Sequence, residues 1–316
     1  MSRHHPPRLP LLIGPNDDKP RGGPSQINNT SGPRASSRLR ICVLGSGSAG
    51  NSTVVTLDGR AMLVDAGFGP RTTAARLRGT GLAPADIHAI VLTHLDRDHF
   101  RLTWFATLIR YRIALWLHRK YLGTFERIAG VQRLQRARLV RVFDGQPFEP
   151  ITALRTTAIH LPHDVHGTTG FLFESDAGRI GYATDLGRVP TELIQRFAAV
   201  DVLAIESNYD PRMQRASGRP AFLVRRIMDG RGHLSNQQAF EAVRRIVEHD
   251  PSGRPDHILL LHRSQQCNRP QLVRQVFDAD ERIGPRVVLT EQHRRSQWLD
   301  VAAPPARRPR QLAWAF

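Results

Sequence analysis

Short apolar runs, separated by glycine-rich or Asp-Gly turns, follow one another along the chain from Arg38 onward. Runs rich in Val, Ile and Leu that end at such turns are typical of buried strands, and apolar positions three or four residues apart are typical of helices. The pattern predicts helices at 71–79, 190–197, 219–229, 235–249 and 270–279, with one or two more within 101–130. It predicts strands at 40–44, 52–57, 61–65, 88–93, 113–118, 138–143, 151–160, 169–175, 179–184, 201–206 and 257–261.

The predicted strands come in two groups, and helices follow each group. This order favours an α/β (α+β) sandwich, in which two sheets pack face to face with helices outside, over one doubly wound sheet. The first 38 residues show no sustained period and contain Pro-Pro, Gly-Pro and Gly-Gly, so we expect residues 1–38 to be a disordered basic arm. A single domain is expected at 39–292, followed by a basic tail at 293–316.

The composition agrees with a globular protein. The 316 residues, 40% of them hydrophobic, are enough for one large domain or two small ones. No apolar run is long enough to cross a bilayer, and the N-terminus lacks the apolar core of a secretory signal. Cys42 and Cys267 are too few for a disulfide framework. We therefore expect a cytoplasmic protein without a membrane partner, in which both cysteines fill small apolar spaces.

The formal net charge of +17 comes almost entirely from arginine, because Lys19 and Lys120 are the only lysines. Residues 1–40 carry seven basic and two acidic side chains, and residues 293–316 carry five basic and one acidic. Basic ends on a basic body favour a polyanionic partner such as nucleic acid. A solubility surface in an arginine-rich proteome explains the same charge, and the sequence leaves both explanations open.

The most concentrated chemistry lies in Thr93-His94-Leu95-Asp96-Arg97-Asp98-His99, directly after the apolar run Ile90-Val91-Leu92. Two histidines and two aspartates at the end of a strand can turn toward one point, as a metal site requires. Further polar groups end later apolar runs, at His163-Asp164, Asp185 and His262. Each alone is more typical of a cap or a core residue, but together they predict a metal centre with two ions.

Two more polar features follow predicted strands. The loop Gly45-Ser46-Gly47-Ser48-Ala49-Gly50-Asn51-Ser52 lacks the lysine of a P-loop and the spacing of a dinucleotide fingerprint. It is therefore either a phosphate cradle of another kind or a turn that needs positive φ. Asp65 either orients a metal-binding histidine through a hydrogen bond or caps a turn.

In chain order, these motifs resemble those of the metallo-β-lactamase fold hydrolases. The matching set is the glycine-rich loop, Asp65, Thr-His-x-Asp-x-Asp-His, His163-Asp164 and Thr184-Asp185-x-Gly187. The later runs are similar to the YycJ/WalJ-like, exonuclease-like branch: Glu206-Ser207-Asn208-Tyr209-Asp210, Gly232-His233-Leu234-Ser235-Asn236, and Leu261-His262-Arg263-Ser264 with Asn268. The resemblance covers residues 40–290 approximately and implies an αββα sandwich of two mixed sheets with a dinuclear metal site at the sheet edge.

The resemblance also implies a ligand set. One ion would be held by His94 and His163, the other by Asp98, His99 and His262, and Asp185 would bridge the two. Asp96 stands where the family motif has histidine. A carboxylate is a harder ligand than imidazole, so Asp96 would either shift the preference from zinc toward manganese or iron or leave the first site loosely occupied. His160 could supply a substitute imidazole, although it does not match the motif position.

Two divalent ions of this kind would deprotonate a bridging water near neutral pH and neutralise charge on a phosphoryl oxygen. Asp98 would also orient this hydroxide, and His233 would hydrogen-bond a phosphate or protonate the leaving oxygen. Supporting or substrate-contacting roles are expected for Asp65, Asp164 and Asn208. Ser235 and Asn236 would have a similar role or would cap the helix that begins there.

The motifs and the positive charge predict a metal-dependent phosphodiesterase, exonuclease-like, that acts on nucleic acid and on DNA more than RNA. One alternative is a hydrolase of a small ester, thioester, lactam or phosphodiester, because the fold does not select the electrophile. Another is a non-catalytic nucleic-acid binder whose metal site has degraded at Asp96. The aromatic residues Trp104, Trp116 and Tyr111, near Arg110 and Arg112, would either stack on unpaired bases or pack a helix. The oligomeric state is left open.

Overall fold

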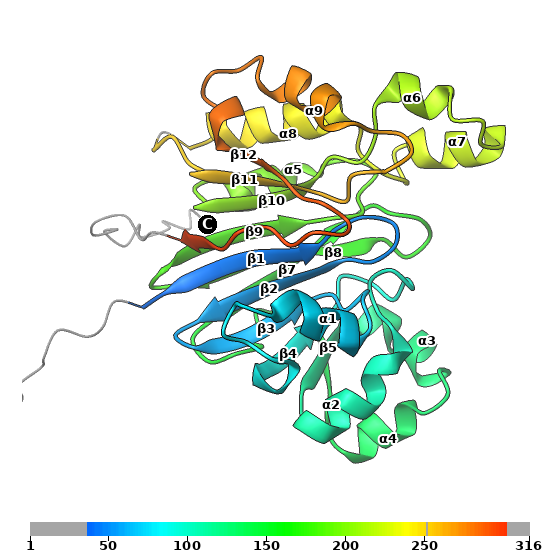
Figure 1. Ribbon diagram of the computed structural model, residues 1–316, viewed down its shortest axis with the longest axis vertical. Coiled ribbons are helices and arrows are strands. Elements are labelled where there is room, and N and C mark those ends of the chain that lie inside the picture. The colour runs from blue at the N-terminus through cyan, green and yellow to red at the C-terminus, as the bar shows by residue number, and fades with distance from the viewer. Residues whose placement is uncertain (1–36, 251, 302–316) are drawn as a thin grey trace, which may run out of the picture. The chain divides into compact units, whose positions relative to one another are not determined.

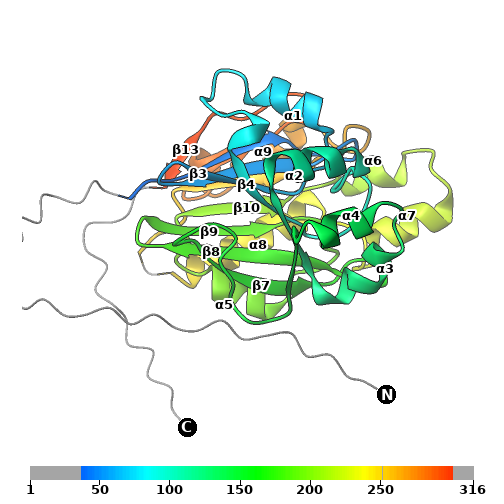
Figure 2. The same ribbon diagram turned by 90° about the horizontal axis from the view of Figure 1, so that it is seen from below.

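The computed structural model describes residues 37–250 and 252–301. Residues 1–36 of the expected arm and 302–316 of the expected tail lie outside this range. The described residues belong to one compact unit, and their strands form two sheets. Figures 1 and 2 show the sheets as adjacent layers with helices on the two outer faces. The expected αββα sandwich is thus confirmed.

The first sheet has the strand order β13-β1-β2-β3-β4-β5-β6. Neighbours from β13 to β3 are antiparallel, and those from β3 to β6 are parallel. Parallel neighbours end at the same edge, so polar residues after β3 and β4 are brought together. The strands are β1 (Leu39–Gly45), β2 (Ser52–Leu57), β3 (Arg60–Val64), β4 (Ile87–Val91), β5 (Ala114–His118), β6 (Val140–Phe143) and β13 (Leu299–Val301).

The second sheet has the order β12-β11-β10-β9-β8-β7. Its neighbours from β12 to β9 are parallel, and those from β9 to β7 are antiparallel. The carboxyl ends of β9, β10 and β11 therefore also share one edge. The strands are β7 (Arg155–Leu161), β8 (Thr168–Ser175), β9 (Gly178–Ala183), β10 (Val202–Glu206), β11 (His257–Leu261) and β12 (Val287–Leu289).

Helices cover the outer face of each sheet. The first sheet packs against α1 (Pro70–Leu77), α2 (Phe105–Tyr111), α3 (Leu122–Glu126) and α4 (Val131–Arg136). The second packs against α5 (Thr191–Phe197), α8 (Asn236–Glu248) and α9 (Pro270–Phe277). Two further helices, α6 (Pro211–Arg215) and α7 (Ala221–Met228), lie at the end of the second sheet, as Figure 1 shows. Among the described residues, no helix has the length and hydropathy needed to span a bilayer.

The alternation of side chains along each strand divides the core into layers. On β1, Ile41 and Val43 belong to the cluster between the two sheets, whereas Cys42 and Leu44 pack under the helices of the first sheet. A Cβ at Gly181 of β9 would lie 2.9 Å from the ring of Phe197. Glycine at this position therefore lets α5 pack closely on the second sheet.

Both cysteines, Cys42 and Cys267, are free and buried. Cys42 belongs to the apolar core under the helices of the first sheet, as expected, whereas Cys267 is buried in the loop after β11 and belongs to none of the apolar clusters among the described residues. Burial raises the pKa of the Cys42 thiol, which keeps it protonated and unreactive.

The structure differs from the predicted elements in a few places. β7 begins at Arg155 rather than at residue 151, because Ile151 and Leu154 reach the core from a turn that precedes the strand. The pattern did not predict α4, α6, β12 or β13, which have too few residues to show a period. The two short strands are held by pairing with β11 and β1.

Candidate metal centre

Polar side chains follow the strands that end at one edge of the sandwich, and they converge there. Asp65, Asp185 and His262 come directly or almost directly after β3, β9 and β11, and all three have left-handed backbone angles, with φ of 61°, 53° and 51°. Such angles turn the chain sharply and cost free energy for a non-glycine residue. At His262 the conformation is held from both sides, because its N–H donates to Ser46 Oγ at 2.8 Å and its carbonyl accepts from Asn208 Nδ2 at 2.7 Å.

One group of potential ligands consists of His94, His163 and Asp185. One ligand atom from each lies within 4.8 Å of the others, and all three residues are buried. Nδ1 of His163 donates to the carbonyl of Gly232 at 2.7 Å, and Nδ1 of His94 lies 2.9 Å from the Thr93 hydroxyl. Each ring is therefore oriented through Nδ1, which leaves Nε2 to bind a cation.

A second group consists of Asp98, His99 and His262, again within 4.8 Å. Nδ1 of His99 lies 2.7 Å from Asp65 Oδ2, and the Thr93 backbone N–H donates to Asp65 Oδ1 at 2.9 Å. The carboxylate of Asp65 thus fixes the orientation of His99 from behind, which agrees with one of its two expected roles. Nε2 of His262 is buried and has no hydrogen-bond partner.

Asp185 lies between the two groups. Its Oδ2 is 3.1 Å from Nε2 of His99, and its Oδ1 is 3.0 Å from Nδ1 of His262. The Thr184 hydroxyl donates to Oδ2 at 2.8 Å. This central position is the one that a carboxylate shared by two cations would need.

The charges of the cluster support one another. Burial would raise the pKa of Asp185, but the charges of His262 and His99 hold it well below its usual value. Burial would likewise lower the pKa of His99 and of His262, but Asp185 and further carboxylates hold both well above the usual value. By contrast, burial and the charge of His99 hold the pKa of His94 well below its usual value.

The donor set fits divalent cations. It combines four imidazoles with the carboxylates of Asp98 and Asp185, and these are groups that zinc, manganese and iron bind in proteins. Each imidazole has Nδ1 in contact with another group of the protein and Nε2 directed toward the cluster. Nε2 of His262 is buried without a hydrogen bond, 3.6 Å from Asp98 Oδ2, and is the kind of atom that a cation would satisfy.

Asp96 lies at the margin of this cluster. Its side chain is 60% exposed, and Oδ2 is 3.7 Å from Nε2 of His94. A ligand oxygen of Asp96 also lies within 4.8 Å of His163 and Asp164. Asp164 forms a two-pronged ion pair with Arg226, at 2.9 and 2.5 Å. His160 is exposed and contacts Lys120 Nζ at 3.4 Å, away from these groups.

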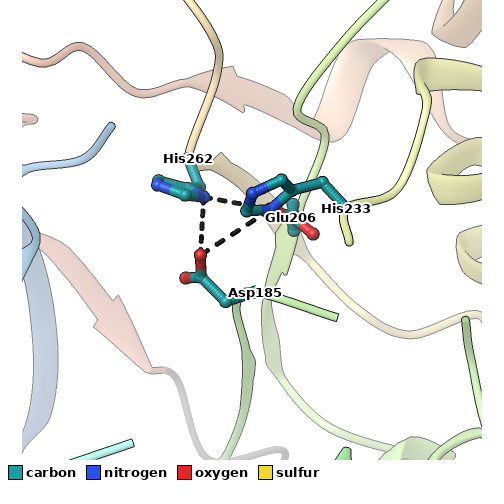
Figure 3. Close-up of side chains that lie close together, drawn as sticks. All are labelled: Asp185, Glu206, His233 and His262. Atoms are coloured by element: carbon teal, nitrogen blue, oxygen red, sulfur yellow. Dashed lines mark hydrogen bonds and ion pairs between the residues drawn. The ribbon is translucent and has the colours of Figure 1, made fainter. Parts of the chain in front are cut away.

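Glu206, the last residue of β10, was given no role by sequence analysis. It is fully buried, and Oε1 is 2.8 Å from Nδ1 of His233 and 3.0 Å from Nδ1 of His262. Figure 3 shows these three side chains with Asp185. Oε2 of Glu206 accepts from the backbone N–H groups of Leu186 and Leu234, both at 3.1 Å. The signal in the sequence was an acidic residue that ends an apolar strand.

Asn51 in the glycine-rich loop was also missed. Its Nδ2 lies 2.9 Å from Nε2 of His99 and 3.4 Å from Oδ2 of Asp98, and its backbone N–H donates to the carbonyl of Asp98 at 2.7 Å. A Cβ at Gly67 would collide with the same carbonyl. The loop is therefore a tightly packed support for the segment that carries Asp98 and His99.

The remaining expected site residues have structural contacts. Asn208 lines the cavity, and its Nδ2 donates to the backbone carbonyl of His262. Ser235 caps α8 in a capping box with Gln238, as one alternative expected. Asn236 is buried, accepts from the Ser207 hydroxyl at 2.8 Å and pairs with Asn268. Trp104 is fully buried and donates to the carbonyl of Phe68, so its ring packs the core and is not available to a base.

A cavity of about 400 Å³ opens over the cluster. Potential ligands and His233 line it together with two arginines, Arg219 and Arg226. It therefore places positive charge beside the carboxylates and imidazoles, where an anionic substrate would enter. The lining residues are Ser48, Asp96, Asp98, His163, Asp164, Asp185, Asn208, Arg219, Leu223, Arg226, Ile227, Gly232, His233, His262 and Ser264.

Comparison with known proteins agrees with this architecture. A family model described as beta-lactamase superfamily domain matches residues 60–262. Exodeoxyribonuclease YycJ of Bacillus anthracis is 27% identical over 237 residues, which are 75% of this chain and 86% of that protein. Exodeoxyribonuclease WalJ of Streptococcus pneumoniae serotype 2 is 26% identical over 252 residues, which are 78% of this chain and 91% of that protein.

The fold is also found among solved structures. The crystal structure of the metallo-beta-lactamase fold protein YhfI from Bacillus subtilis matches with a TM-score of 0.61 and 15% identity, over 83% of this chain and 99% of that one. Together with the family match, this likeness explains why the strand-end motifs occur in the observed order. The chain belongs to the β-lactamase superfamily, and it is a metal-dependent hydrolase with the metallo-β-lactamase fold.

Proposed function

We propose that this hydrolase cleaves phosphodiester bonds of nucleic acid, DNA more than RNA, in the manner of an exonuclease. The observation that carries the proposal is the position of Asp185 between two groups of potential ligands, at a cavity that also contains Arg219 and Arg226. Relatives named exodeoxyribonuclease and the formal charge of +17 support a polyanionic substrate. Two unpaired cysteines agree with a reducing cytoplasm.

The proposal includes two divalent cations. His94 and His163 would hold one, Asp98, His99 and His262 the other, and Asp185 would contact both. Zinc fits the four imidazoles, whereas an oxygen ligand from Asp96 would favour manganese or iron. When bound, two such ions lower the pKa of a water between them and neutralise charge on a phosphoryl oxygen.

His233 is placed to supply the proton that the leaving oxygen needs. Its side chain is 21% exposed and lines the cavity, while Nδ1 is held by buried Glu206 at 2.8 Å. Nε2 is then the nitrogen that exchanges a proton with substrate, and the Glu206 carboxylate accepts from Nδ1 and fixes the orientation of the ring. Asp98, which is partly exposed at the cavity, accepts a hydrogen bond from the attacking water and so orients it.

The test compares substrates on one preparation whose metal content has been measured. Labelled single- and double-stranded DNA, RNA and bis(p-nitrophenyl) phosphate are incubated with the protein, with and without added manganese. We expect DNA to be shortened from an end, and Asp98→Ala and Asp185→Ala to abolish this while the far-ultraviolet circular dichroism spectrum stays unchanged. Turnover of the small phosphodiester without cleavage of any nucleic acid would overturn the substrate assignment. Tight DNA binding with no turnover at full metal occupancy would mean that the protein binds nucleic acid without cleaving it.

A further inference from the structure

Phe222, on α7, is an exposed aromatic residue beside the cavity. Its side chain is 73% exposed, whereas the next residue, Leu223, lines the cavity. None of the eight residues of α7 is buried. Figures 1 and 2 show α7 standing away from the two sheets, next to α6. Leu223, Arg226 and Ile227 of the same helix line the cavity, so the solvent-exposed ring of Phe222 belongs to a helix that forms part of the cavity wall.

The carboxyl end of α7 is fixed to the loops that carry the potential ligands. Arg226 pairs with Asp164, and the N–H of Asp164 donates to the carbonyl of Arg231 at 2.8 Å. A Cβ at Gly187 would lie 2.3 Å from the carbonyl carbon of Gly230, so the loop after β9 and the loop after α7 are in backbone contact. Phe222 therefore projects from a helix whose other end is anchored at the metal centre.

The segment around α7 carries a surplus of positive charge. Between residues 210 and 231 there are six arginines and two aspartates. Asp210 caps α6 through its side chain, and Asp229 accepts from the N–H of Arg231. Arg219 lines the cavity and donates to the side-chain carbonyl of Gln266 at 2.9 Å, and it forms no ion pair with any residue that the structure describes. Its charge is thus available to a phosphate.

We propose that Phe222, near the start of α7, and Arg219, just before that helix, bind an unpaired nucleotide adjacent to the scissile one, with its base stacked on Phe222 and its phosphate contacting Arg219. This inference rests on the proposed function and names the part of the substrate that the cavity itself does not hold. An exposed ring offers its face to any unpaired base, and the guanidinium of Arg219, whose described partners are the neutral side chains of Gln266 and Gln214, keeps its charge for a phosphate. Stacking requires an unpaired base, so the preferred partner is single-stranded DNA or a frayed end.

Binding of a fluorescein-labelled, phosphorothioate-protected single strand to the full, metal-loaded chain tests this without turnover. We expect Phe222→Ala to weaken binding by about tenfold or more and Phe222→Trp to restore it. Arg219→Gln should weaken binding and reduce the slope of log K against log salt by about one. The controls are Tyr111→Ala and Arg110→Gln, an exposed aromatic and its neighbouring arginine on α2 that do not line the cavity, and both should leave affinity unchanged.

Two further measurements separate the possible failures. Unmodified single strands are tested for cleavage by the wild type, which examines the proposed function without reference to α7. Unchanged affinity of Phe222→Ala, with cleavage intact, would overturn the role of α7 alone. Light scattering gives the oligomeric state, and dissociation of a dimer by Phe222→Ala with unchanged DNA affinity would make Phe222 an interface between copies and also overturn the proposal.

Discussion

Oε1 of Glu206 lies 2.8 Å from Nδ1 of His233 and 3.0 Å from Nδ1 of His262, so one buried carboxylate contacts both a potential proton donor and a potential metal ligand. Burial would raise the pKa of Glu206, but the charge of His233 and its hydrogen bond lower it below the usual value. The ionised carboxylate can therefore accept from Nδ1 of His233 and fix the orientation of its ring.

Glu206→Gln should reduce cleavage of DNA by about 100-fold, because His233 loses the carboxylate that accepts from Nδ1 and orients its ring. Hydrolysis of bis(p-nitrophenyl) phosphate should fall far less, since p-nitrophenolate leaves without a proton. His233→Asn should show the same contrast between the two substrates. Equal loss on both substrates, together with loss of bound metal, would mean that Glu206 acts through His262 and not through His233.

Asp65→Asn should weaken metal binding by about 10- to 100-fold, because the amide cannot replace the carboxylate that holds Nδ1 of His99. Asp65 is fully buried and accepts from Thr93 as well as from His99, so the carboxylate is firmly placed. Equilibrium dialysis followed by metal analysis measures the change. The control is Asp58→Asn, an exposed carboxylate in the turn between β2 and β3. Full metal retention by Asp65→Asn would show that His99 is oriented by Thr93 alone.

The position of the metal centre could be predicted from sequence because the signal is local. Apolar runs that end in His or Asp mark strand ends, and parallel neighbours such as β9, β10 and β11 bring those ends to one edge. His94, His163 and Asp185 were found in this way, and the structure places their ligand atoms together. Their role as ligands stays a prediction that metal analysis will test.

The supporting contacts could not be predicted, because they join residues that are distant in the chain. Asn51 contacts His99 across 48 positions, and Glu206 contacts His262 across 56. No spacing rule relates such pairs, and each depends on how closely the glycine-rich loop and β10 approach the neighbouring strands. Likewise, the pattern around Trp104 does not show whether its ring faces solvent, and the structure buries it completely.

Asp96→His should raise zinc affinity by about tenfold, or about 1.4 kcal/mol, relative to manganese, if Asp96 occupies a ligand position. The present side chain is close to His94 but 60% exposed, so a longer imidazole is needed to reach the same cation. Competition with a chelating dye measures both affinities. Asp176→His, at an exposed turn, controls for the added histidine. Unaltered affinity and selectivity would show that Asp96 is not a ligand and that the first ion is held without it.

Metal-induced stabilisation should grow as pH rises. Without a cation, Asp185 and its neighbours hold the pKa of His99 and of His262 well above 6.5, so their contribution to stability is complete below that pH and is lost as pH rises through the raised values. Cation binding requires neutral imidazoles, so affinity should increase about tenfold per pH unit for each proton displaced. The melting temperature is measured between pH 6 and 9, with EDTA or with manganese. The difference between the two melting temperatures should therefore increase with pH. Asp185→Asn removes the charge that raises both pKa values, so the melting temperature measured with EDTA should depend less on pH in this variant than in the wild type. The same pH dependence in both proteins would contradict the charge arrangement described.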